Sequence, residues 1–178
     1  MEQGWPKWVR SMVTVESTAD SNTSSATQSR RVPKLFITGW GPFNLTIPAQ
    51  EASSGGNTMN GATVGILSVD TNYPFGDSAL IRAERVTQPF TLALRIPGWA
   101  TEASLTIYAS RSSASGKGRR PVVVPCVNGT YHDVQIGAGT TTLSLEFHPH
   151  IRLSYGWGPD GTNAVAVMRG SLLYVLPL

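Results

Sequence analysis

The chain has 178 residues, of which 40 % are hydrophobic and 14 % are charged, and its net charge is +3. This length and composition fit a single globular domain with a core of its own. Lys and Arg are scattered apart from a short cluster at Lys117, Arg119 and Arg120, which is typical of a solvated loop. We therefore expect no nucleic-acid partner.

The sequence carries no signal for a membrane or for export. It has no run of about 18 apolar residues, so we expect no membrane-spanning helix. Its first residues lack the basic and then apolar order of a secretory signal peptide. We assign no localisation from the sequence; it would be extracellular if the chain were part of a larger secreted enzyme.

Two stretches have the composition of long flexible loops. Residues 16–31 are half Ser and Thr with no large apolar side chain, so burial cannot offset the entropy lost on ordering them. Residues 49–62 combine small and polar side chains with several glycines, which is typical of a connector between strands. We predict that the first stretch is a disordered loop and that the second links two strands.

The remaining segments show the two-residue period of β-strands. Leu92, Leu94 and Ile96 alternate with less apolar neighbours, and the same alternation recurs at Leu105 and Ile107, at Val134 and Ile136, at Leu143, Leu145 and Phe147, and in residues 163–176. The 18 Gly and 12 Pro interrupt the chain too often for long helices to form. The sequence predicts an all-β fold, an antiparallel β-sandwich of jelly-roll type with long flexible loops.

A metal site would need three or four converging nitrogen or sulfur ligands. The available side chains are Cys126, His132, His148 and His150, and Pro149 separates the last two. Their spacing does not match a known metal-binding pattern, and Cys126 lies between apolar neighbours as a buried, inert thiol would. We predict no metal site and no cofactor in this chain.

Acid–base catalysis could instead use two carboxylates that face one substrate. Asp70 and Asp77 flank a turn, where Asp more often accepts a backbone N–H than acts as an acid. Glu84, Glu102 and Glu146 stand at outward positions of strands or beside them, which predicts solvent-facing charge. No catalytic residue is assigned.

Aromatic side chains could serve as flat platforms for sugar rings. The candidates for carbohydrate binding are Trp157, Tyr155 and Trp40, and Trp157 lies in a Gly-rich loop where exposure is most expected. Tyr73 and Trp99 are further aromatic candidates for this role, but such residues are more often buried in the core or at an interface.

Residues 70–100, DTNYPFGDSALIRAERVTQPFTLALRIPGWA, carry a specific resemblance. This segment and the closing strand resemble the β-sandwich region of the β-L-arabinofuranosidase family of glycoside hydrolases, family 127. The matching positions combine a YPF turn, an R-I-P-x-W strand end and an RG-x-L-x-Y strand: Tyr73, Pro74, Phe75, Arg95, Ile96, Pro97, Trp99, Arg169, Gly170, Leu172 and Tyr174. The QGWPK and GPFNLT segments also resemble members of this family.

The resemblance implies a retaining glycosidase with a helical toroidal catalytic domain followed by β-sandwich domains. Such enzymes release terminal β-L-arabinofuranose from plant-type glycans, using a thiolate nucleophile held beside zinc. The cysteine ligands would precede the QGWPK segment, and none of them is in this chain. Zinc is therefore expected only in full-length family members, and Cys126 matches no catalytic position.

From this resemblance we expect residues 1–15 to be a remnant that joins a missing catalytic domain, and residues 32–178 to be the sandwich. The expected function is a non-catalytic accessory domain of an arabinofuranosidase-like hydrolase, inactive alone, whose partners are that catalytic domain and arabinose-containing glycans. The alternatives are a free-standing carbohydrate-binding module, or a structural or interaction domain.

Overall fold

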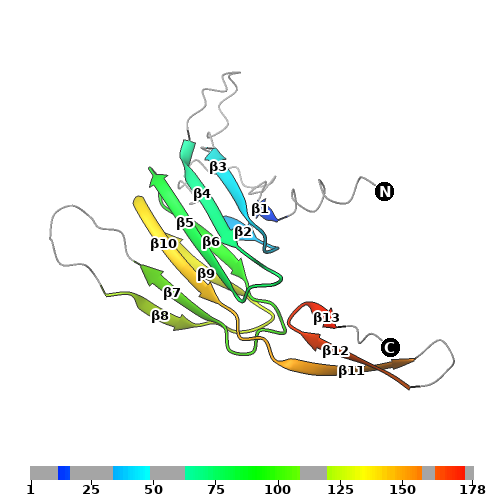
Figure 1. Cartoon of the computed structure of the whole chain (residues 1–178). Coiled ribbons are helices and arrows are strands. Elements are labelled where there is room, and N and C mark those ends of the chain that lie inside the picture. The colour runs from blue at the N-terminus through cyan, green and yellow to red at the C-terminus, as the bar shows by residue number, and fades with distance from the viewer. Residues whose placement is uncertain (1–11, 17–33, 49–62, 109–119, 158–162, 175–178) are drawn as a thin grey trace, which may run out of the picture.

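The computed structural model describes residues 12–16, 34–48, 63–108, 120–157 and 163–174 (Figure 1). The two stretches predicted as flexible loops, 16–31 and 49–62, lie outside the described residues apart from Glu16. Within the described part of the chain all regular structure is β-strand, which confirms the all-β prediction. No helix in that part is long and apolar enough to cross a membrane.

Two sheets form the body of the domain. The first has the order β1-β2-β6-β9 and contains β1 (Val13–Val15), β2 (Lys34–Ile37), β6 (Phe90–Arg95) and β9 (Tyr131–Ile136). The second has the order β3-β4-β5-β10-β7-β8 and contains β3 (Phe43–Pro48), β4 (Thr63–Thr71), β5 (Ser78–Val86), β7 (Ser104–Tyr108), β8 (Val122–Pro125) and β10 (Gly139–Glu146). All pairs are antiparallel except β2 with β6, which is parallel.

The apolar faces of these two sheets pack against each other as a β-sandwich. Alternate residues of β6 and β9, including Leu92, Leu94 and Val134, share one buried cluster with Leu143 and Leu145 of β10. The alternation seen in the sequence therefore identifies the core face correctly. The same cluster includes further buried side chains from both sheets: Leu35, Ile37, Leu67, Val69, Ile81, Ala83, Leu105 and Ile136.

The outward face of β6 is buried at Ala93, which the alternation of this strand did not predict. Ala93 points away from the core and is nevertheless fully buried. Its neighbours β2 and β9 make contacts across it: the rings of Phe36 and Tyr131 meet edge to face at 5.5 Å, and Lys34 Nζ lies 2.7 Å from the Asp133 carboxylate. A small side chain at the centre of the sheet is covered by its larger neighbours.

A third sheet follows the sandwich in the sequence. It has the order β11-β12-β13 and contains β11 (Ile151–Trp157), β12 (Asn163–Arg169) and β13 (Leu172–Tyr174). Figure 1 shows it projecting from one end of the sandwich. The sequence predicts a joining segment at residues 1–15 and a sandwich at residues 32–178. In the structure β1 pairs with β2, and β11–β13 form a sheet of their own.

Candidate functional site

The turn between β4 and β5 points one aromatic side chain inward and another outward. The hydroxyl of Thr71 accepts a hydrogen bond from Tyr73 N (3.1 Å) and donates one to Ser78 O (2.7 Å). The Asn72 carbonyl accepts from the N–H groups of Phe75 and Gly76, both at 2.9 Å. The Tyr73–Pro74 peptide bond is cis. Tyr73 packs against the core, whereas Phe75 is 74 % exposed.

Phe147 is the centre of an aromatic cluster next to this turn. Its ring lies edge to face with Trp40 (5.4 Å between centroids), Trp99 (5.6 Å) and Tyr73 (6.4 Å). Tyr73 and Trp99 stack almost in parallel, with 9° between their planes. Phe147 is 1 % exposed, so the cluster closes this end of the core. Edge-to-face and stacked pairs of this kind add stability beyond the area they bury.

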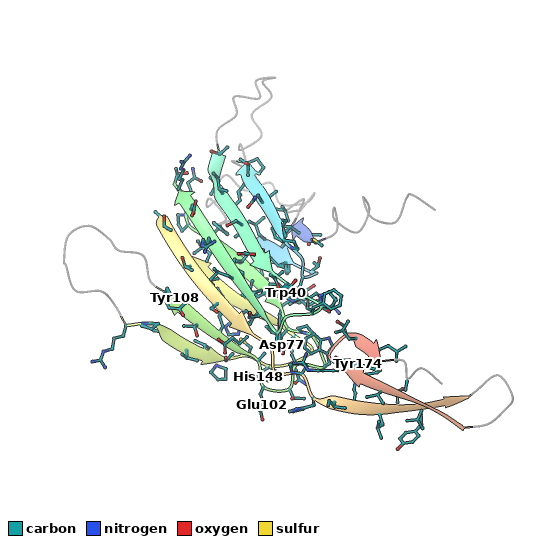
Figure 2. All side chains as sticks on the ribbon, viewed as in Figure 1. Trp40, Asp77, Glu102, Tyr108, His148 and Tyr174 are labelled. Atoms are coloured by element: carbon teal, nitrogen blue, oxygen red, sulfur yellow. The ribbon has the colours of Figure 1, made fainter. Side chains whose placement is uncertain are left out.

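An ion pair connects the turn to the third sheet. The Arg169 guanidinium, at the end of β12, donates to both carboxylate oxygens of Asp77, with Nη1 at 3.1 Å from Oδ1 and Nη2 in close contact with Oδ2. These bonds raise the pKa of Arg169 above its usual value. Figure 2 places Asp77 at the end of the sandwich beside the sheet that carries Tyr174. Two parallel bonds fix the relative orientation of the two groups.

Gly170 completes the contact between the third sheet and the sandwich. Its φ is +60°, in the left-handed region that side chains rarely adopt. A Cβ here would lie 3.3 Å from Cβ of Pro149 and 3.5 Å from the Trp99 ring. Pro149 itself forms an isolated antiparallel β-bridge with Ala100 of the sandwich. We call Tyr73, Asp77, Trp99, Phe147, Pro149, Arg169 and Gly170 the joint.

The three carbohydrate-binding candidates do not form one platform. Trp40 is only 3 % exposed, and its Nε1 donates to Arg95 O at 3.0 Å, so this ring belongs to the core and cannot present a face to a sugar. Tyr155 lies on β11 and is 72 % exposed. Trp157 ends the same strand, but its side chain lies outside the described residues.

The acidic side chains behave largely as the sequence predicted. Glu84, Glu102 and Glu146 are all exposed. Asp77 differs, because its carboxylate binds Arg169 and the hydroxyl of Thr71 caps the turn instead. The joint therefore contains one carboxylate, which a guanidinium neutralises, rather than the facing pair that glycosidases of the two-carboxylate type use.

Cys126 is buried as predicted. Burial raises the pKa of its thiol, and Sγ donates weakly to Val124 O at 3.8 Å. A protonated, buried thiol is a poor nucleophile and a poor metal ligand. Within the described ranges no three His, Cys, Asp or Glu side chains lie close enough together to hold a metal ion.

The chain is similar to known proteins in structure and not in sequence. No protein-family model matches the chain, and no curated protein matches its sequence. A solved structure described as a glycoside hydrolase is similar to it, with a TM-score of 0.51 and 20 % sequence identity, over 78 % of this chain and 20 % of that chain. The chain therefore shares its fold with about a fifth of that structure.

Two further solved structures are similar at lower scores. One is a GH127 β-L-arabinofuranosidase from Geobacillus stearothermophilus, with a TM-score of 0.45 and 20 % identity over 79 % of this chain and 20 % of that chain. The other is a GH127 β-arabinofuranosidase, with a TM-score of 0.44 and 14 % identity over 79 % of this chain and 22 % of that chain. The chain thus spans about a fifth of the length of the enzymes it matches.

The signal for the joint was already present in the sequence pattern. Tyr73, Trp99, Arg169 and Gly170 were among the positions that resemble family 127, although residues 73 and 169 are far apart in the chain. The structure brings these four together at one end of the sandwich. Asp77, the partner of Arg169, was not part of the pattern and was interpreted as a turn residue.

Proposed function

We propose that the chain is a non-catalytic β-domain of a β-L-arabinofuranosidase-like glycoside hydrolase, in which it supports a separate catalytic domain. The observation that carries the proposal is the position of the pattern residues. Four of the eleven positions that resemble family 127, Tyr73, Trp99, Arg169 and Gly170, gather at the joint, where their contacts are ring packing, an ion pair and a close backbone approach. These are the contacts of residues that hold parts of a protein together.

The chemistry of the described residues supports a non-catalytic role. The family resemblance implies a zinc-bound thiolate, and the thiol of Cys126 is buried with a raised pKa. Acid–base hydrolysis would need two free carboxyl groups facing one sugar, and Asp77 is held by Arg169. The reaction itself would take place in the part of the enzyme to which this domain is attached.

The alternative, a free-standing carbohydrate-binding module, would use Tyr155, the exposed candidate whose side chain is described. Sugar sites combine an aromatic platform with side chains that bond the hydroxyl groups. The described neighbours of Tyr155 on its own face, Leu153 and Val165, are apolar. This environment favours packing against a protein over binding a sugar.

Two parallel experiments test the proposal. Calorimetric titration with arabinofuranosyl oligosaccharides measures binding. An assay for released L-arabinose, in the presence of zinc and a thiol reductant, measures hydrolysis. We expect a folded chain that neither hydrolyses nor binds these sugars. Release of L-arabinose would contradict the non-catalytic role. Binding without hydrolysis, lost in Tyr155→Ala, would replace the proposal with the binding module.

A further inference from the structure

The surface of the sandwich presents two copies of the tripeptide that accepts N-linked glycans. This acceptor tripeptide is Asn-x-Ser or Asn-x-Thr, where x is not Pro, so that a hydroxyl side chain stands two residues after the Asn. It occurs at Asn44-Leu45-Thr46 and at Asn128-Gly129-Thr130. A third copy, Asn22-Thr23-Ser24, lies outside the described residues.

The first acceptor tripeptide lies on the exposed face of strand β3. Asn44 and Thr46 are two residues apart on an extended strand, so their side chains point to the same side of the sheet, and both are exposed. Ser68 is directly opposite Asn44 on β4, and its small side chain offers little hindrance to a sugar ring. The Asn44 amide makes no hydrogen bond within the described part of the chain, so attaching a sugar to it breaks no contact of the fold.

Strand β3 is also an edge strand that lacks the usual protection against pairing with another chain. The strand order puts it at one edge of the six-stranded sheet, where β4 is its one partner among the described strands (Figure 1). Natural edge strands are commonly protected by charged side chains or prolines. Strand β3 carries no charge, and its proline, Pro48, is its last residue. Strand β8, at the opposite edge, has Pro121 before it and Pro125 at its end. A glycan on Asn44 would place a bulky, hydrated group at the unprotected edge.

The second acceptor tripeptide lies in the turn between β8 and β9. Residues 127–130 are all exposed. Two backbone hydrogen bonds hold the turn on the sandwich, from Gly129 N to Ile96 O (3.0 Å) and from Ile96 N to Thr130 O (2.8 Å). The side-chain nitrogen of Asn128 donates to Gly98 O at 3.2 Å. An Asn amide has two N–H groups, and glycosylation replaces one hydrogen, so the other can keep this bond.

The transfer needs a lipid-linked sugar donor and no redox partner. The Asn amide nitrogen attacks the anomeric carbon of an oligosaccharide carried on a lipid diphosphate. The new N–C bond forms as the bond between that carbon and the diphosphate oxygen breaks. The amide nitrogen loses one proton, and the lipid diphosphate leaves with the electron pair. The folded domain then has to tolerate the product, and an exposed Asn with open surroundings does so.

We propose that Asn44 and Asn128 carry N-linked oligosaccharides in the natural protein, and that the glycan on Asn44 protects the edge of β3. Because this modification belongs to secreted proteins, the proposal also places the natural protein on the secretory route. It is independent of the proposed function, since it rests on the two acceptor tripeptides and their exposure.

Peptide mass spectrometry of the protein isolated from the organism that makes it tests both sites. An amidase that releases N-glycans converts each glycosylated Asn to Asp, and in water labelled with heavy oxygen the new carboxyl group carries the label. We expect the label at residues 44 and 128 and none at Asn72, an exposed Asn with Pro74 two residues later. The absence of label at Asn44 or Asn128 would overturn the assignment of that residue. Equal labelling of Asn72 would overturn both, because it would show spontaneous deamidation.

Variants secreted from a eukaryotic host test the need for the hydroxyl. Thr46→Ala should remove one glycan, seen as a faster band in gel electrophoresis, whereas Thr46→Ser should keep it. Thr63→Ala changes an exposed Thr of the neighbouring strand β4 and is the matched control, which should keep both glycans. A glycan that persists in Thr46→Ala, or one that is lost in Thr63→Ala, would overturn the assignment of Asn44.

The role of the glycan at the edge has its own test. Asn44→Gln and Asn128→Gln each remove one glycan, but Asn44 alone is on an edge strand. Turbidity during concentration of the two secreted variants should therefore rise earlier in Asn44→Gln. Equal turbidity in the two variants would overturn the protective role.

Discussion

Replacing Phe147 by alanine is expected to lower the free energy of unfolding by about 3–5 kcal/mol, the usual range for removing a buried phenylalanine. The ring is 1 % exposed and contacts Trp40, Tyr73 and Trp99, so its loss leaves a cavity at the centre of the aromatic cluster. Denaturation by urea, followed by circular dichroism, measures the change.

Phe75→Ala is the control for this prediction, because it removes the same side chain from the adjacent turn. Phe75 is 74 % exposed, so its replacement should change the free energy of unfolding by no more than about 0.5 kcal/mol. Equal losses in the two variants would show that the turn does not point Tyr73 inward and Phe75 outward as described.

Gly170→Ala is expected to lower the free energy of unfolding by about 2–3 kcal/mol, combining the strain of a left-handed side-chain residue with overpacking. The φ of Gly170 is +60°, and the new Cβ would lie 3.3 Å from Cβ of Pro149. The β12–β13 turn would then have to move away from Pro149, which lies in the segment that leads into β11. The same denaturation experiment measures the loss.

Gly129→Ala separates strain from packing. Gly129 also has a positive φ, +74°, but the nearest atom to its new Cβ would be 4.0 Å away. Its replacement should therefore carry the backbone strain alone, about 1 kcal/mol. If both variants lost the same amount, Gly170 would not be packed against Pro149 and Trp99.

Much of the sandwich could be predicted from the sequence because alternation identifies a strand with one buried face. Leu143, Leu145 and Phe147 are buried where the pattern indicated. The burial of Ala93 could not be predicted from this alternation. Neighbouring strands cover it with Phe36, Tyr131, Lys34 and Asp133, and a local period does not show which distant strands pair.

The third sheet could not be separated from the sandwich in the sequence. Its strands show the same two-residue period as those of the core, and the period does not tell which partner an apolar face meets. The burial of Trp40 was missed for a similar reason. Its indole N–H bonds to the carbonyl of Arg95, a residue 55 positions away.

The joint was predicted in part. A resemblance in sequence identified Tyr73, Trp99, Arg169 and Gly170 as a set, but it could not say what the set does. The role of Asp77 depended on its meeting Arg169, 92 residues later in the chain. The sequence indicated which residues matter, and the structure is needed to show that they pack and pair.

Amide hydrogen exchange in Asp77→Asn tests whether the joint holds the third sheet on the sandwich. Asp133→Asn, which removes the exposed pair with Lys34 on the first sheet, is the control. Loss of the bond to Arg169 should speed amide exchange in β12 and β13 and leave β5 and β10 unchanged. Two results would contradict this role of the joint. One is an exchange rate in β12 and β13 equal to that of the natural chain, and the other is an equal increase of that rate in Asp133→Asn.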